Sequence, residues 1–163
     1  MYLSYFQSPL GPIRIEASDT GLLSVLFIDE GEGNYMLEQG EANTITRKTS
    51  LQLQEYFNGA RQIFDLPLAL QGSAFQLRVW QELLHIPFGK TDTYGAIAYK
   101  LNNPLSVRAV GTANGQNPIA IIIPCHRCIG ANGKLTGYAG GLWRKEYLLK
   151  IEQAEQPVQT RLW

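Results

Sequence analysis

Three short segments near the start of the chain alternate hydrophobic and polar residues, as half-buried β-strands do. These segments are residues 2–6, 13–17 and 22–27. The residues between them favour turns: Ser8-Pro9-Leu10-Gly11 and Asp19-Thr20-Gly21. A helix is predicted over residues 44–57, with Leu51, Tyr56 and Phe57 toward the core, and a loop over the acidic residues 29–34. We therefore expect an α/β N-terminal domain, built from a small antiparallel sheet and one helix.

A change of pattern near residue 72 predicts a second domain. Residues 65–72 include Pro67 and Gly72 and indicate a linker, which divides the chain into domains 1–72 and 73–163. Ser73 and Gln76 have the spacing of a capping box, which starts a helix. The apolar stripe of that helix is Phe75, Val79, Trp80, Leu83 and Leu84. Trp80 is interpreted as a core residue.

Two short helical patterns follow, over residues 93–101 and 106–113, and Asn102-Asn103-Pro104 separates them. Ser106 is predicted to cap the second of these helices. Two helices joined by a tight turn, the second with small residues and Arg108, fit a helix-turn-helix, although a generic helical hairpin has the same pattern. A last helix is predicted over residues 142–152, followed by a polar tail over residues 153–163. The C-terminal domain is therefore expected to be mostly α-helical.

A cysteine beside a histidine is the strongest chemical signal in the chain. The apolar run of residues 119–123 predicts a buried strand that delivers Cys125 and His126 into a loop, and the glycine-rich residues 130–141 follow. A thiolate is the form of cysteine that attacks, and a neighbouring base or positive charge lowers the thiol pKa toward neutrality. We therefore expect Cys125 to be a nucleophile that is held ionised beside His126.

Other interpretations of this cysteine have to be weighed. Most buried cysteines are inert packing groups. Cys125 and Cys128 could also belong to a redox or zinc motif, but the chain has two cysteines and two histidines, and the other histidine, His85, is distant in sequence. The turn Gly130-Ala131-Asn132-Gly133 also differs from the helix that follows a thioredoxin-like motif.

Composition sets broad limits. At 163 residues, with 45% hydrophobic and 17% charged residues, the chain is long enough for one ordinary domain or two small ones with packed cores. The longest apolar run is far shorter than a membrane span, and the N-terminus lacks the pattern of a signal peptide. Two cysteines three positions apart make no disulfide framework, which favours the cytoplasm.

The formal net charge of zero conceals two halves of opposite charge. Residues 1–74 carry four Lys or Arg against nine Asp or Glu, a net of −5, and residues 75–152 carry nine against four, a net of +5. Phosphate binding depends on the local field rather than on the total charge. The second half is therefore a candidate for nucleic-acid binding.

Residues 117–127, Asn-Pro-Ile-Ala-Ile-Ile-Ile-Pro-Cys-His-Arg, closely resemble the active-site signature of the O6-alkylguanine-DNA alkyltransferases. The resemblance covers residues 73–152 and is looser before them. It implies a ribonuclease H-like N-terminal domain and a winged-helix-like C-terminal domain. It also implies DNA repair by irreversible transfer of an alkyl group from O6-alkylguanine to cysteine, once per molecule and without a cofactor. The implied partner is double-stranded DNA and the implied form is a monomer; O4-alkylthymine activity and cooperative DNA binding are left open.

The same resemblance implies roles for residues of the reaction centre. Cys125 would accept the alkyl group, His126 would act as its base through a water molecule, and Glu152 would orient the histidine. Asn117 would tie the turn after the recognition helix to the active-site segment. Tyr94 would help to evict the base and would donate a proton to the departing guanine.

It further implies residues that contact DNA or the extruded base. Arg108 would fill the gap left by the flipped nucleotide. Ser106, Ala109 and Thr112 belong to the recognition helix, which would enter the minor groove. Residues that would line or support the base pocket are Tyr138, Ala139, Gly140, Lys145 and Cys128, and Arg127 is interpreted as structural.

Two positions depart from the family pattern. Cys128 stands where valine is common, and its backbone carbonyl would still accept from the guanine amine; as a second thiol it could be a minor alkyl acceptor or form a disulfide with Cys125. Ala139 replaces a serine of some members. Two other functions compete with alkyl transfer: a non-catalytic protein that binds the lesion, and a thiol redox protein.

Overall fold

The computed structural model describes residues 1–29 and 40–154, and these residues form two compact units. The first unit is Met1–Gln71 with Pro118–Ala120, as far as it is described, and the second is Gly72–Asn117 with the described residues from Ile121 onward. The loop expected over residues 29–34 lies, apart from Asp29, outside the described residues. So does the predicted tail from residue 155 on.

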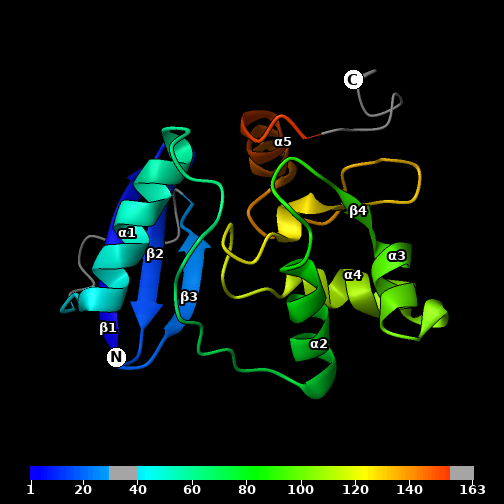
Figure 1. Cartoon of the computed structure of the whole chain (residues 1–163), viewed down its shortest axis with the longest axis horizontal. Helices are drawn as coiled ribbons and strands as arrows, with labels where there is room; N and C mark the ends of the chain where they lie inside the picture. The colour runs from blue at the N-terminus through cyan, green and yellow to red at the C-terminus, as the bar shows by residue number, and fades with distance from the viewer. Residues whose placement is uncertain (30–39, 155–163) are drawn as a thin grey trace. The chain divides into compact units, whose positions relative to one another are not determined.

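The first unit contains an antiparallel sheet in the order β1-β2-β3, with β1 at Tyr2–Ser8, β2 at Gly11–Ala17 and β3 at Leu22–Phe27. Helix α1, Thr44–Phe57, packs on β1 and β2 (Figure 1). Alternation places Ile13, Ile15 and Ala17 in the core. The predicted strands and helix are confirmed.

The inner face of α1 differs in part from the predicted one. Leu51 was expected in the core, but 56% of it is exposed, so that prediction is wrong. Thr49, Leu53 and Tyr56 are the buried residues, because their spacing of four and three places them on one side of the helix, away from position 51. Phe57 is half-buried and stacks on Phe6, with the ring centroids 6.2 Å apart.

The second unit is mainly helical. Its helices are α2 (Ala74–Leu83), α3 (Tyr94–Lys100), α4 (Val107–Gly115) and α5 (Leu142–Ile151), with the short 3₁₀ helices η2 (Pro104–Ser106) and η3 (Cys125–Arg127). A two-stranded parallel sheet joins β4 (Asp92–Thr93) to β5 (Cys128–Ile129). Figure 1 shows α2, α3 and α4 together on one side of this small sheet, consistent with the predicted helix-turn-helix.

The start of α2 follows the prediction, and one residue of its predicted apolar stripe does not. Ser73 accepts from the backbone N–H of Gln76 at 3.1 Å, and Gln76 accepts from the N–H of Ser73 at 2.9 Å, which confirms the capping box. Trp80 is buried, as expected. Leu84 is 41% exposed and was wrongly assigned to the core, because the helix ends at Leu83 and Leu84 is its C-cap.

Ser106 does not cap α4 through its side chain. It lies in η2, and its hydroxyl donates to the backbone oxygen of Asn103 at 2.6 Å. The predicted capping bond is therefore wrong: Pro104 starts a 3₁₀ turn that runs directly into α4, and the serine satisfies that turn instead.

The apolar run of residues 119–123 is not a strand. Ile119 makes one isolated bridge to Val25, and residues 120–122 form a turn in which Ile121 has a φ of 71°. A short apolar run identifies a buried segment without determining its backbone. Here a side chain, rather than a neighbouring strand, bonds the backbone of this run: Asn117 Nδ2 donates to the Ile123 carbonyl at 2.8 Å.

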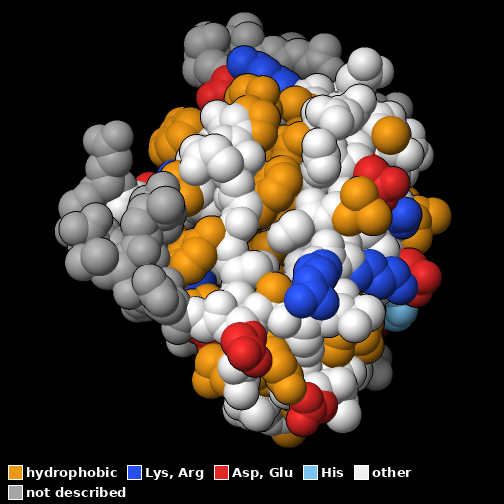
Figure 2. Space-filling model, turned by 90° about the vertical axis from the view of Figure 1, so that its left-hand side faces the viewer, with side chains coloured by type: hydrophobic (Ala, Val, Ile, Leu, Met, Phe, Trp, Pro, Cys, Tyr) orange, Lys and Arg blue, Asp and Glu red, His pale blue; other side chains and the backbone are white. Residues whose placement is uncertain are grey.

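Surface charges are mixed on the side of the molecule where α1 lies. Figure 2 shows Lys and Arg side chains there interspersed with acidic and hydrophobic ones. In the described ranges, no helix has the length and apolar character to cross a membrane.

Gly21 is a test of the contact between β3 and residues 67–69. Leu22 N–H donates to the Pro67 carbonyl, Ala69 N–H donates to the Leu22 carbonyl, both at 2.8 Å, and a Cβ at Gly21 would lie 2.8 Å from Ala69 N. We expect Gly21→Ala to force this backbone apart and lower the free energy of unfolding by roughly 2 kcal/mol in urea titrations. Gly115→Ala in α4, whose Cβ meets nothing within 4 Å, should be neutral or stabilising. An equal loss in both variants would contradict this account.

Candidate active site

Cys125, His126 and Arg127 form a buried 3₁₀ turn. The turn is closed by two backbone bonds, from Cys125 N–H to the Ile123 carbonyl at 2.8 Å and from Arg127 N–H to the Pro124 carbonyl at 2.9 Å. Asn117 secures the same segment through its bond to Ile123. The cysteine and arginine are 6% exposed and the histidine is fully buried. Adjacent polar side chains are thus held in the interior, where each needs a partner.

Asn114 also reaches this turn, and the sequence analysis did not identify it. It lies on the inner face of α4, 1% exposed, and its Nδ2 donates to the Cys125 carbonyl at 3.4 Å. A polar residue at a core position of an otherwise small-faced helix was the available signal. The bond joins the predicted recognition helix directly to the segment that carries the cysteine.

Glu152 accepts hydrogen bonds from two neighbours in the turn. Its Oε2 lies 2.7 Å from His126 Nε2, and Arg127 donates through Nε to Oε1 at 2.8 Å and through Nη2 to Oε2 at 3.1 Å. The carboxylate is at the C-cap of α5 and is 2% exposed. Burial alone would raise the pKa of Glu152, but the contacts with His126 and Arg127 lower it to about 2. Glu152 is therefore ionised near neutral pH.

The charge on Glu152 determines which nitrogen of His126 is basic. Burial lowers the pKa of His126, against the opposing effect of Glu152, so the imidazole is neutral near pH 7. An ionised carboxylate only accepts, so Nε2 carries the hydrogen. Nδ1 is then the basic nitrogen, and it is buried without a hydrogen-bond partner among the described residues. The arrangement leaves a basic nitrogen buried in the residue that follows Cys125 in sequence.

Cys125 is not held as a thiolate in the resting protein, contrary to expectation. Burial raises the pKa of its thiol, and the hydrogen bond from Asn117 and the charge of Lys145 offset this only in part. The predicted lowering is wrong because the sulfur lies inside the protein, where a charge is poorly solvated. Its proton must therefore be removed when it reacts.

A second polar cluster surrounds Lys145, which is fully buried. Its ammonium donates to the backbone carbonyls of Cys128 at 2.6 Å and Thr136 at 2.8 Å, and to the Tyr94 phenol at 3.4 Å. Tyr94 in turn donates to the Thr136 carbonyl at 2.9 Å. Burial raises the pKa of Tyr94 and lowers that of Lys145 to about 8. The phenol therefore keeps its proton near pH 7.

The glycine-rich segment brings Tyr138, Ala139 and Gly140 to the start of α5. The Tyr138 hydroxyl is buried without a hydrogen-bond partner among the described residues, and burial raises its pKa well above the usual value. The Gly140 carbonyl accepts from Arg144 Nη1 at 2.9 Å, and Ala139 is exposed.

Apart from Ser106, which lies just before it in η2, the residues predicted to contact DNA from the recognition helix lie on the outside of α4. Arg108, Ala109 and Thr112 are exposed, and the Thr112 hydroxyl donates to the Arg108 carbonyl at 3.1 Å. Val110, Ala113 and Asn114 face inward. The Ala113 carbonyl accepts from the Trp80 indole N–H at 2.9 Å, which anchors the helix to α2.

Both cysteines are free and buried, and burial raises the pKa of the Cys128 thiol to about 12. Within residues 1–29 and 40–154, no group of three or more His, Cys, Asp or Glu is placed to hold a metal ion. Burial thus disfavours the thiolate form of both cysteines.

Two family models match the chain. Residues 1–70 match the ribonuclease-like domain of 6-O-methylguanine DNA methyltransferase, and residues 74–154 match the DNA binding domain of the same family.

Curated relatives and solved structures agree with these matches. The methylated-DNA–protein-cysteine methyltransferase of Methanosarcina mazei is 49% identical over 154 residues, 94% of this chain and 98% of the relative. That of Mycobacterium tuberculosis is 54% identical over 160 residues, 96% and 94% of the two chains. The crystal structure of M. tuberculosis OGT in complex with DNA aligns with a TM-score of 0.85 and 41% identity, over 97% of this chain and 96% of that one.

The Glu152 contacts make stability depend on pH in acid. Because the pKa of Glu152 in the folded protein lies below its ordinary 4.5, its contribution is complete above pH 4.5 and is lost as pH falls toward 2. We expect the difference in unfolding free energy between the wild type and Glu152→Gln to shrink over that range by on the order of 3 kcal/mol.

Chemical denaturation at a series of pH values measures this difference. Glu146→Gln is the matched control, since Glu146 lies on the same helix and pairs with Lys150 on the surface. It should change stability by less than about 1 kcal/mol. If the difference in unfolding free energy between the wild type and Glu152→Gln did not change with pH, His126 and Arg127 would not lower the pKa of the Glu152 carboxylate.

Proposed function

Because this chain belongs to the 6-O-methylguanine DNA methyltransferase family, we propose that Cys125 is the residue that receives the alkyl group. The chain is a methylated-DNA–protein-cysteine methyltransferase, which repairs DNA by transferring an alkyl group from O6-methylguanine to a protein cysteine. One observation carries the choice of Cys125: it adjoins a buried neutral imidazole whose Nδ1 has no hydrogen-bond partner among the described residues.

In the proposed step, His126 Nδ1 takes the thiol proton of Cys125 through a bridging water molecule as the sulfur attacks the alkyl carbon. The S–C bond forms while the bond from that carbon to O6 breaks, and the electron pair remains on the guanine. The imidazolium formed is stabilised by the Glu152 carboxylate 2.7 Å from Nε2. The thiol pKa raised by burial is consistent with ionisation during the reaction rather than before it.

The departing guanine then needs a proton, and we assign Tyr94 as the donor. Its phenol is un-ionised near pH 7 and is held by Thr136 and Lys145. Lys145 also fixes the carbonyl of Cys128, which would accept from the guanine amine. Tyr138, with Ala139 and Gly140, would form the wall against which the extruded base stacks, a contact worth roughly 1–3 kcal/mol.

DNA is proposed to bind along α4. Arg108 would enter the duplex and fill the gap left by the flipped nucleotide, while Ser106, Ala109 and Thr112 would lie against the minor groove. The exposed and small side chains of this face allow a close approach, and Asn114 and Asn117 link it to Cys125. Because such binding would use the DNA backbone and the shape of the groove, we expect it to tolerate different base sequences.

We propose a monomer that reacts once, in the cytoplasm. One chain supplies every protein group that the step requires, and the product is a thioether, which no described residue of the site is placed to cleave. Two free thiols are consistent with a reducing compartment. The competing function, lesion binding without reaction, does not use the Cys125, His126 and Glu152 arrangement.

The first test locates the alkyl group. After incubation with duplex DNA containing O6-methylguanine, intact mass and peptide mapping should show one added methylene per protein, on the peptide of Cys125. Cys125→Ser should gain no mass, while Cys128→Val should be labelled as the wild type is. DNA binding without any mass change would support lesion recognition instead, and a label on Cys128 would refute our assignment.

The second test concerns Arg108. Arg108→Ala should slow single-turnover transfer from duplex DNA by roughly tenfold or more, and transfer from a single-stranded oligonucleotide much less, because only the duplex leaves a gap to fill. Arg47→Ala removes an equal charge from α1 and should leave both rates unchanged. Equal slowing on the two substrates would mean that Arg108 acts by charge alone.

A further inference from the structure

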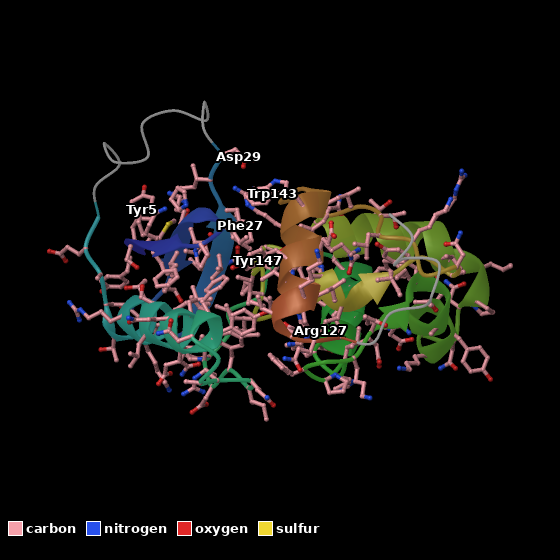
Figure 3. The ribbon with its side chains drawn as sticks, turned by 90° about the horizontal axis from the view of Figure 1, so that it is seen from above. Tyr5, Phe27, Asp29, Arg127, Trp143 and Tyr147 are labelled. Atoms are coloured by element: carbon pink, nitrogen blue, oxygen red, sulfur yellow. The ribbon has the colours of Figure 1, made fainter. Side chains whose placement is uncertain are left out.

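Arg127 makes more contacts with the reaction centre than a structural role in its loop requires. Figure 3 shows it beside the end of α5, where Glu152 is the C-cap. Two nitrogens of its guanidinium bond the two oxygens of Glu152, at 2.8 and 3.1 Å, and Nη1 donates to the Ile86 carbonyl at 2.8 Å. The group is 6% exposed, and its Cζ lies 5.8 Å from the centroid of the Phe88 ring.

The geometry on the carboxylate links Arg127 to His126. Oε2 of Glu152 accepts from both His126 Nε2 and Arg127 Nη2, while Oε1 accepts from Arg127 Nε. A carboxylate held at two points by a planar fork cannot rotate about its own axis without breaking both bonds. The oxygen that faces the imidazole is therefore fixed by the arginine.

We propose that Arg127 is a positioning residue for alkyl transfer: it fixes the Glu152 carboxylate against His126 and, by sharing its charge, keeps the imidazole neutral until Cys125 gives up its proton. This inference rests on the proposed function, in which His126 is the base. It extends that function, because the Arg127 guanidinium would control how strongly His126 holds a proton.

Charge accounting supports this role. With Arg127 present, the guanidinium, the carboxylate and a neutral imidazole sum to zero, so the resting triplet carries no net charge in a buried site. Without the guanidinium, the carboxylate would act on the imidazole alone and would favour its protonated form, which cannot accept the thiol proton. Of the charges acting on His126, Glu152 favours protonation, and Arg127 and Lys145 oppose it.

Helix α2 also packs against η3, and its charged residues leave the balance of charges at His126 unchanged. The charged residues of α2 are engaged elsewhere: Arg78 donates to the Leu101 carbonyl at 2.8 Å, and Glu82 lies 3.6 Å from the imidazole of His85. The thiols of Cys125 and Cys128 and the phenols of Tyr94 and Tyr138 all have pKa values raised by burial and are uncharged near pH 7.

The experiment follows the protonation of His126 directly, in the full chain. The chain has two histidines, so NMR of histidine-labelled protein gives two imidazole signals, and His85→Gln identifies them. We expect the midpoint of the His126 titration to move up by about one pH unit in Arg127→Met. The acid limb of the single-turnover transfer rate should move up in pH with it.

Arg127→Lys separates charge from geometry, and it also serves if Arg127→Met does not fold. A single ammonium cannot bridge both oxygens of Glu152 and the Ile86 carbonyl. We expect the His126 titration to rise less than in Arg127→Met, while the rate at its pH optimum still falls several-fold, because the carboxylate is no longer fixed.

The outcomes divide clearly. A His126 titration and a rate profile unchanged in either variant would overturn the proposal, as would a loss of rate equal at every pH with no change in the titration. The NMR measurement needs no DNA and no alkyl transfer. If the wild type failed to label Cys125 while the His126 titration moved as expected, the proposed function would fall and the coupling of Arg127 to His126 would stand.

Discussion

The site depends on one buried carboxylate that serves two neighbours at once. Glu152 accepts from His126 and Arg127, which are adjacent in sequence, so a single group at the end of α5 orients two consecutive side chains of η3. A buried charge without partners would be strongly unfavourable, and here it has three hydrogen bonds. The turn that carries the cysteine and helix α5 therefore require each other.

Burial acts in opposite directions on the acid and on the base of the proposed step. It raises the pKa of Cys125 and lowers that of His126, so the resting pair is neutral and its proton stays on sulfur. The reactive ion pair exists only during transfer. A thiol of this kind reacts slowly with general electrophiles, which suits the proposed function, in which Cys125 reacts once.

Hydrogen bonds from side chains to the backbone connect the proposed DNA-binding helix α4 to the segment that carries Cys125. Trp80 holds α4 at the Ala113 carbonyl, Asn114 reaches from α4 to the Cys125 carbonyl, and Asn117 bonds the Ile123 carbonyl. These bonds replace the sheet ladder that a strand at residues 119–123 would have provided. The exposed face of α4 and the proposed acceptor sulfur are thereby connected, across the distance that a flipped base would span.

The sequence by itself determined the features that depend on neighbours along the chain. The strands of the first unit, α1, the capping box of α2 and the two helices around residues 102–106 all follow from local periodicity and turn chemistry, and the Cys-His motif indicated the proposed reaction centre by resemblance. Only the tertiary structure decided that residues 119–123 turn, that Leu51 faces outward and that Cys125 has a raised pKa. It also decided that Glu152 is buried between His126 and Arg127. Burial and pKa are set by groups that arrive from distant parts of the chain, and no local pattern records them.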